Sequence, residues 1–169
     1  KKYNIHQLST GDLLRNEIKN GSELGIKISS IMNSGELVSD EIVGDLIEKF
    51  ISNKDYKNKI IFDGYPRTLS QAKNLDILLK KYNQKIDIVL KLDVSLDTIK
   101  KRILERKSIE QRADDNEEIA IKRFQTYQKS SETVLNYYEQ TKLLKVVNGE
   151  NSISQINNEI SDLIDSIKG

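Results

Sequence analysis

The 169-residue sequence contains no cysteine, one proline and one methionine, and it has no apolar run near the roughly 20 residues of a membrane helix. Without cysteine the chain can form neither a disulfide nor a thiolate site. Its 27 basic and 26 acidic residues leave a net charge of +1, which is not expected of a dedicated nucleic-acid binder. These absences exclude thiol chemistry and predict a cytoplasmic globular domain that binds neither membrane nor nucleic acid.

Arginine is scarce, with six residues against 21 lysines. A composition that uses lysine wherever either cation serves makes each remaining arginine a candidate for a role that needs the planar guanidinium, which binds phosphate or carboxylate through two hydrogen bonds. The alternative for any single arginine is an ordinary surface salt bridge. The six are Arg15, Arg67, Arg102, Arg106, Arg112 and Arg123.

Short apolar segments with strand character alternate with longer helical patterns. Strands are predicted at 6–8, 60–62, 86–94 and 143–147, and helices at 42–50, 72–82, 96–103, 115–138 and 153–167. Ser39 and Ser95 are expected to cap the helices that follow them. This alternation predicts an α/β domain with a parallel sheet and helices on both faces, in which ligands bind beyond the carboxyl ends of the strands.

The segment from Ser9 to Arg15 joins a predicted strand end to a helix start. Free backbone amides and the helix dipole favour an anion at such a place, and Arg15, one turn further along, can face the same ligand. The alternative is an ordinary helix cap followed by a surface arginine.

The segment from Asp63 to Gln71 follows a buried strand. Asp63 ends that strand, where a carboxylate can hold the hydration shell of Mg²⁺. Gly64 and Pro66 predict a sharp turn that projects Arg67 over the strand ends. The carboxamide of Gln71 offers the donor and acceptor pair that matches an adenine edge. The alternative is that Asp63 caps a helix and Gln71 is a solvated residue.

Four arginines cluster around the short segment 107–111. Arg102 and Arg106 lie four apart on one helix face, with Arg106 at the predicted helix end, and Arg112 and Arg123 follow the segment. Four guanidinium groups that converge repel one another unless an anion of several charges lies among them, and this favours a polyphosphate. Salt-bridged helix ends are the alternative interpretation.

Five motifs in this order and spacing resemble the adenylate kinase family, over essentially the whole chain. They are 6–15 (HQLSTGDLLR), 35–43 (GELVSDEIV), 63–71 (DGYPRTLSQ), 102–106 (RILER) and 112–123 (RADDNEEIAIKR). The resemblance implies a P-loop nucleoside monophosphate kinase fold and the reversible reaction of ATP with AMP to give two ADP.

The resemblance also implies site residues. AMP would be bound by Thr10, Arg15, Glu36, Leu37, Val38, Gly64, Tyr65, Pro66, Arg67, Gln71, Arg112 and Arg123. ATP would be bound by Arg102, Arg106 and Asn151, with the loop 148–151 against its adenine. Arg67, Arg106, Arg112 and Arg123 would be catalytic, because they neutralise the charge of the transferring phosphoryl group, and Asp63 would hold water on Mg²⁺.

The resemblance further implies one kinase domain over 1–169, a monomer, with an AMP-binding region at 9–38 and a short lid at 107–111. This lid has no Cys or His of the kind that binds zinc in longer lids. A UMP/CMP kinase has a similarly short lid and is the alternative within this class, although Gln71 favours adenine.

The sequence departs from the family in one respect: it contains no GxxxxGK[ST] phosphate loop, which family members carry with their first strand near the N-terminus. A nucleotide-binding chain without catalysis is therefore the hypothesis from another class. We expect the 169 residues alone to be poorly stable and inactive, since a parallel sheet without an inner strand leaves backbone groups unpaired.

Overall fold

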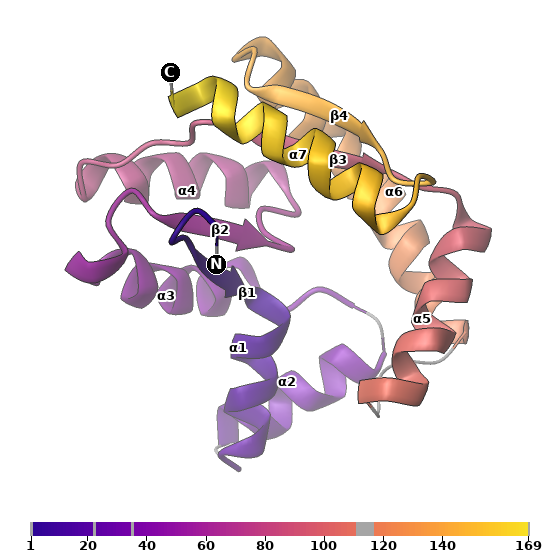
Figure 1. Ribbon diagram of the computed structural model, residues 1–169. Coiled ribbons are helices and arrows are strands. Elements are labelled where there is room, and N and C mark those ends of the chain that lie inside the picture. The colour runs from indigo at the N-terminus through magenta and orange to yellow at the C-terminus, as the bar shows by residue number, and fades with distance from the viewer. Residues whose placement is uncertain (1, 22, 35, 111–116, 169) are drawn as a thin grey trace. The chain divides into compact units, whose positions relative to one another are not determined.

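The computed structural model describes residues 2–21, 23–34, 36–110 and 117–168, with the backbone alone at 107–110 and 168. Among the described residues, no helix combines the length and the apolar character that a membrane span requires. In chain order (Figure 1) the elements are β1 (His6–Ser9), α1 (Thr10–Lys19), α2 (Glu23–Asn33), α3 (Asp40–Ile51), the short 3₁₀ helix η1 (Lys54–Tyr56), β2 (Ile60–Asp63), α4 (Leu69–Lys81), β3 (Val89–Asp93), α5 (Leu96–Glu110), α6 (Glu117–Gln140), β4 (Leu144–Asn148) and α7 (Ile153–Lys168).

The strands form two parallel pairs, β1 with β2 and β3 with β4. The pairs belong to two compact units, the first made of Lys1–Lys85 and Thr126–Val134, the second of Ile86–Gln125 and Leu135–Gly169. Parallel strands connected through helices confirm the predicted α/β class. Among the described residues the strands form two pairs instead of one continuous sheet, because no described strand bonds to members of both.

In the first unit, β1 and β2 run in register from His6 beside Ile60 to Ser9 beside Asp63. Helices α3 and α4 pack against each other in the same unit (Figure 1). The largest side chains that are almost fully buried in this unit are Leu8, Ile28, Ile47, Ile51 and Leu75. The register brings the carboxyl ends of both strands to one edge, so that the start of α1 and the loop after β2 meet there.

In the second unit, β3 and β4 run in register from Val89 beside Leu144 to Asp93 beside Asn148. Val147 in β4 is fully buried, and α7 packs against this strand (Figure 1). The strand predicted from residue 86 begins at Val89, since the ladder with β4 starts only there.

The two predicted serine caps have different outcomes. Ser95 caps α5 as expected, because its Oγ accepts a hydrogen bond from the backbone N of Thr98 at 3.2 Å. Ser39 precedes α3, but its side chain makes no cap hydrogen bond. The first turn of α3 carries Asp40 and Glu41 instead, whose negative charges suit the positive end of the helix dipole.

The sequence analysis placed the end of this helix at Arg106, but α5 continues to Glu110. The residues after Arg106 include neither proline nor glycine, so nothing local stops the helix. The predicted lid at 107–111 therefore starts as helix, and its last residue lies outside the described residues.

Helix α2 was not expected from the sequence, and it packs against α1. The contact depends on Gly25, where an added Cβ would collide with the backbone carbonyl of Glu17 in α1. Only glycine permits so close an approach of two helices. Helices α1 and α2 thus form one hairpin inside the predicted AMP-binding region 9–38.

Candidate active site

The carboxyl ends of β1 and β2 meet through Thr10, the first residue of α1. Its side chain is only 6% exposed, and its hydroxyl donates toward the backbone carbonyls of Asp63, at 3.3 Å, and Gly64, at 3.1 Å. Ser9 caps α1, since its Oγ accepts from the backbone N of Asp12. The parallel register therefore brings together the two strand-end segments that the sequence analysis singled out.

The loop after β2 holds the exposed side chain of Arg67 by a hydrogen bond. Gly64 has φ +71, and its carbonyl accepts a hydrogen bond from Nε of Arg67 at 2.8 Å. A Cβ added to Gly64 would lie 2.9 Å from Nη2 of Arg67 and 3.3 Å from Oγ1 of Thr10. Glycine is needed here for both reasons: its left-handed backbone and the closeness of two polar side chains.

The side chain of Arg15 extends back toward the first turn of its own helix, α1. Its guanidinium forms an ion pair with Asp12, and a Cβ added to Gly11 would lie 3.0 Å from Nη2 of Arg15. A cation is therefore held beside the first turn of α1, where backbone N–H groups lack intrahelical partners. That Arg15 and the helix start face one anion stays a prediction.

Gln71 lies in the first turn of α4 and is only 3% exposed. Its Oε1 accepts from the backbone N of Arg67 at 2.7 Å, and its Nε2 donates to Oδ1 of Asp40 at 2.8 Å. The alternative that Gln71 is a solvated residue is therefore wrong. Asp63 as a helix cap is also wrong for α4, because Thr68 caps that helix.

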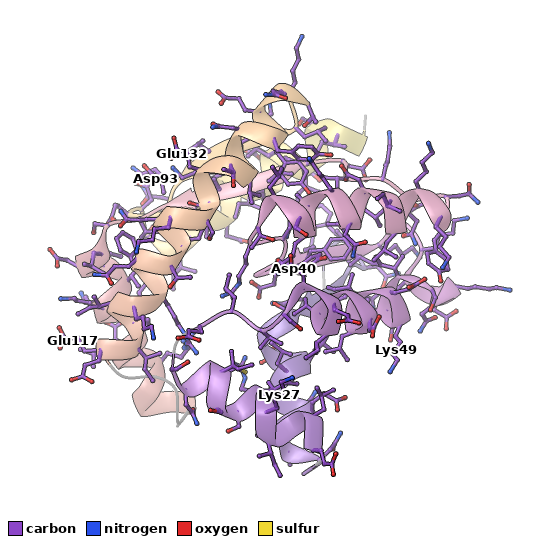
Figure 2. The ribbon with its side chains drawn as sticks, turned by 180° about the vertical axis from the view of Figure 1, so that it is seen from behind. Lys27, Asp40, Lys49, Asp93, Glu117 and Glu132 are labelled. Atoms are coloured by element: carbon purple, nitrogen blue, oxygen red, sulfur yellow. The ribbon has the colours of Figure 1, made fainter. Side chains whose placement is uncertain are left out.

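Asp40 is a residue that sequence reasoning missed. It opens α3, and Figure 2 shows it on the side of that helix toward α4. Besides Gln71 it binds Thr68, whose hydroxyl donates to Oδ2 at 3.3 Å. The partners lie 28 and 31 positions along the chain, so only the packing of α3 on α4 shows the link.

Tyr65 is buried beside Gln71, and its hydroxyl donates to the backbone carbonyl of Gln71 at 3.4 Å. Burial raises the pKa of Tyr65 to about 12. Pro66, next in the chain, is half-buried. The side chain of Tyr65 is therefore uncharged, with an apolar ring and a hydroxyl as its one polar group.

The predicted AMP contacts at 36–38 lie between α2 and α3. Glu36 is exposed and its backbone N donates to the carbonyl of Ile31 at 3.2 Å. Leu37 is half-buried and Val38 is buried. This segment connects the α1–α2 hairpin to Asp40.

In the second unit, the loop after β4 is fastened to α5. Nη2 of Arg102 donates to the carbonyl of Gly149 at 2.6 Å. Glu150 accepts from the backbone N of Ser95 and from the hydroxyl of Thr98, both at 2.5 Å. These hydrogen bonds lower the pKa of Glu150. Glu150 is a second residue that sequence reasoning missed, since its partners lie more than 50 positions away.

The same loop is shaped by its own polar groups. Oδ1 of Asn148 accepts from the backbone N of Glu150 at 3.0 Å, and the carbonyl of Asn148 accepts from the backbone N of Asn151 at 3.4 Å. Arg102 and Asn151, both predicted for ATP, therefore belong to one hydrogen-bonded assembly at the carboxyl end of β4.

Two of the remaining arginines lie on α5 and α6. Arg106 is half-buried on α5 and Arg123 is half-buried on α6, while Nζ of Lys100 lies 3.1 Å from Oε1 of Glu117 and links the two helices. Arg112 lies outside the described residues.

Comparisons with known proteins agree on one family. The family description of adenylate kinase matches residues 1–143. The chain is 38% identical to the adenylate kinase of Pelagibacter ubique, with 97% of this chain and 89% of the relative covered. It is 41% identical to the adenylate kinase of Leptospira biflexa, with 95% and 86% covered. It is 43% identical to that of Xanthomonas campestris pv. campestris, with 91% and 82% covered.

Proposed function

This chain belongs to the adenylate kinase family, and we infer that it serves the reversible transfer of a phosphoryl group between ATP and AMP that gives two ADP. The named relatives are all adenylate kinases, so the comparisons do not favour a UMP/CMP kinase. The observation that carries the assignment of a site is the cluster at the carboxyl ends of β1 and β2, where Thr10, Arg67 and Gln71 converge on one loop.

AMP fits this cluster by charge and by hydrogen bonding. The helix start beside Arg15 and the guanidinium of Arg67 suit the phosphate, because both present N–H donors with positive charge. Gln71 suits the adenine, and Tyr65 with Pro66 offers apolar surface beside it. The backbone of 36–38 and the buried Thr10 complete the AMP site in this proposal, within the predicted AMP-binding region 9–38.

ATP fits the second assembly, made of the loop 148–151 and α5. Asn151 and Arg102 are proposed to hold the adenine end of ATP, and Arg106 its phosphates. Arg67, Arg106 and Arg123, together with Arg112 beyond the described residues, would neutralise the charge of the transferring group. Such catalysis needs positioning and electrostatics and no strong base. Closure of 9–38 and of the lid at 107–111 would exclude water as a competing acceptor.

Magnesium is proposed to bind through water to Asp63. Asp63 is exposed at the end of β2, and its Oδ2 accepts from Nε2 of Gln7 at 2.7 Å, which orients the carboxylate. Among the described residues, no three acidic or His side chains gather into a metal-binding group. A single carboxylate still fits Mg²⁺, which keeps several waters and takes phosphate oxygens as its other ligands. When bound, the ion would neutralise charge on those phosphates.

The test separates binding from turnover. We predict that the 169 residues bind AMP but do not phosphorylate it, and that a chain with a GxxxxGK[ST] loop ahead of residue 1 produces ADP from ATP and AMP. Calorimetric titration measures the binding, and a coupled assay of ADP formation measures the turnover, with CMP and UMP as competing acceptors. Turnover of CMP or UMP above that of AMP would contradict the assignment, and robust turnover by the 169 residues alone would contradict a mechanism that needs the phosphate loop.

The proposal extends to the setting of the reaction. We propose a monomer that works in the cytoplasm, where ATP and AMP meet in nucleotide biosynthesis. Sedimentation of the purified chain with and without both nucleotides tests the monomer.

A further inference from the structure

The carboxamide of Gln71 is held from both sides within the first unit. On one side the backbone N–H of Arg67 donates to Oε1 at 2.7 Å, and on the other Nε2 donates to Oδ1 of Asp40 at 2.8 Å. Asp40 is itself held, because its second oxygen accepts from the hydroxyl of Thr68. With Gln71 only 3% exposed, little water can replace either partner.

Both partners allow only one orientation of the carboxamide. An ionised carboxylate accepts hydrogen bonds and cannot donate, whereas a backbone N–H donates and cannot accept. A carboxamide turned by 180° would place its oxygen against the carboxylate of Asp40 and its NH₂ against the N–H of Arg67. Two buried hydrogen bonds would then be replaced by two repulsive contacts, so the observed orientation is fixed.

The hydrogen-bonding capacity that remains on Gln71 is complementary to adenine. An amide oxygen has two acceptor positions and an amide nitrogen two donor hydrogens, and one of each is already used. One acceptor and one donor remain, in a fixed order. Adenine presents an amino donor at position 6 next to an acceptor at N1. A 6-oxopurine presents the reverse, an acceptor at O6 next to an N–H donor at N1.

A freely turning glutamine would therefore serve adenine and a 6-oxopurine equally well. We propose that Asp40 is a positioning residue for the selection of adenine over 6-oxopurines at the AMP site, because together with the backbone N–H of Arg67 it locks the orientation of Gln71. The proposal rests on the proposed function, in which Gln71 contacts the base of AMP. Asp40 acts through Gln71 and does not touch the nucleotide.

The experiment compares the affinities for AMP and for inosine monophosphate, which differs from AMP in carrying the 6-oxo group. Calorimetric titrations are made on the chain and on Asp40→Asn, since asparagine keeps the size of the side chain but can either donate or accept. We expect the preference for AMP to shrink by about ten-fold or more, chiefly through gained affinity for inosine monophosphate. Asp40→Glu keeps an acceptor-only carboxylate and should retain most of the preference.

Two further variants make the result decisive. Glu41→Gln removes the neighbouring charge in the same first turn of α3 and should leave the preference unchanged. Asp40→Ser, which suits a helix start, replaces Asp40→Asn if that variant does not fold, with the same expected loss of preference. An unchanged preference in a folded Asp40 variant that still binds AMP would overturn the proposal.

Gln71→Leu distinguishes that failure from a failure of the proposed function. If Gln71→Leu weakens AMP binding and the Asp40 variants keep the preference, only the role of Asp40 is overturned. If Gln71→Leu leaves AMP affinity unchanged in a folded chain, the assignment of Gln71 to the base falls, and the role of Asp40 falls with it.

Discussion

Replacing Gly64 with alanine tests whether the loop after β2 positions Arg67 for AMP. Gly64 has φ +71, and alanine in this left-handed region costs about 1–2 kcal/mol. Gly21 is a matched control, because it has φ +67 but nothing within 4 Å of an added Cβ. The two substitutions therefore share the backbone strain, and only Gly64→Ala adds crowding.

The methyl group added by Gly64→Ala would crowd side chains of the candidate site more than side chains of the core. The added Cβ would lie 2.9 Å from Nη2 of Arg67, at the end of a flexible side chain that can move aside at little cost in stability. A hydrogen bond between that guanidinium and a phosphate is worth about 1.5–3 kcal/mol. If Gly64→Ala displaces the guanidinium, AMP affinity should fall about ten-fold to a hundred-fold, while both variants lose similar stability.

Urea unfolding and AMP titration of the chain, Gly64→Ala and Gly21→Ala supply the two measurements. An AMP affinity in Gly64→Ala that equals that of Gly21→Ala would refute the reasoning, because the crowded guanidinium would then not contact the phosphate. A loss of stability several kcal/mol larger in Gly64→Ala would also refute it, since the contact would then serve the fold.

Two further predictions concern a single guanidinium and a single phenol. In a chain that carries a phosphate loop, Arg123→Lys keeps the charge but loses the planar guanidinium, so it should cut the rate of ADP formation about a hundred-fold. Lys129→Arg on the same helix is the control and should leave that rate unchanged. If the Arg123→Lys chain formed ADP as fast as the unaltered chain, Arg123 would be interpreted as part of a surface salt bridge. Because the pKa of Tyr65 is raised to about 12 from 10, the folded chain keeps this proton while the unfolded chain loses it, so stability should fall as pH rises above about 10. Between pH 9 and 12, the free energy of unfolding measured in urea should fall less for Tyr65→Phe than for the unaltered chain. If it fell equally steeply with pH in both, the assignment of that pKa would be contradicted.

Local patterns predicted the parts of the fold that local chemistry decides. The strand at 60–62 ends at Asp63 and the cap at Ser95 forms, because alternation, turn residues and a cap lie within a few positions of one another. Helix α2 escaped prediction because its stability depends on Gly25 against α1, a contact between helices. Sequence patterns do not encode such a contact.

The residues of the candidate site likewise divide into those that local patterns predict and those that only packing brings together. Thr10, Gly64 and Gln71 could be proposed from the segments that follow strands, and the structure brings them together. Asp40 and Glu150 could not, since each acts on a partner far along the chain that only packing brings near. Their sequence signal is an acidic residue at a helix start or after a strand, which many surface residues share.

The two strand pairs also affect how the chain folds. His6 pairs with Ile60 and Val89 with Leu144, so each ladder joins segments 54 or 55 positions apart. Closing a loop of that length costs roughly 3.5 kcal/mol of chain entropy before any ladder hydrogen bond forms. Helices with local contacts, such as the α1–α2 hairpin, can therefore form early while the ladders close late. The apolar side chains of Ile61 and Val146 stay exposed after the ladders close, so both strands remain open to association with other chains in the folded state as well.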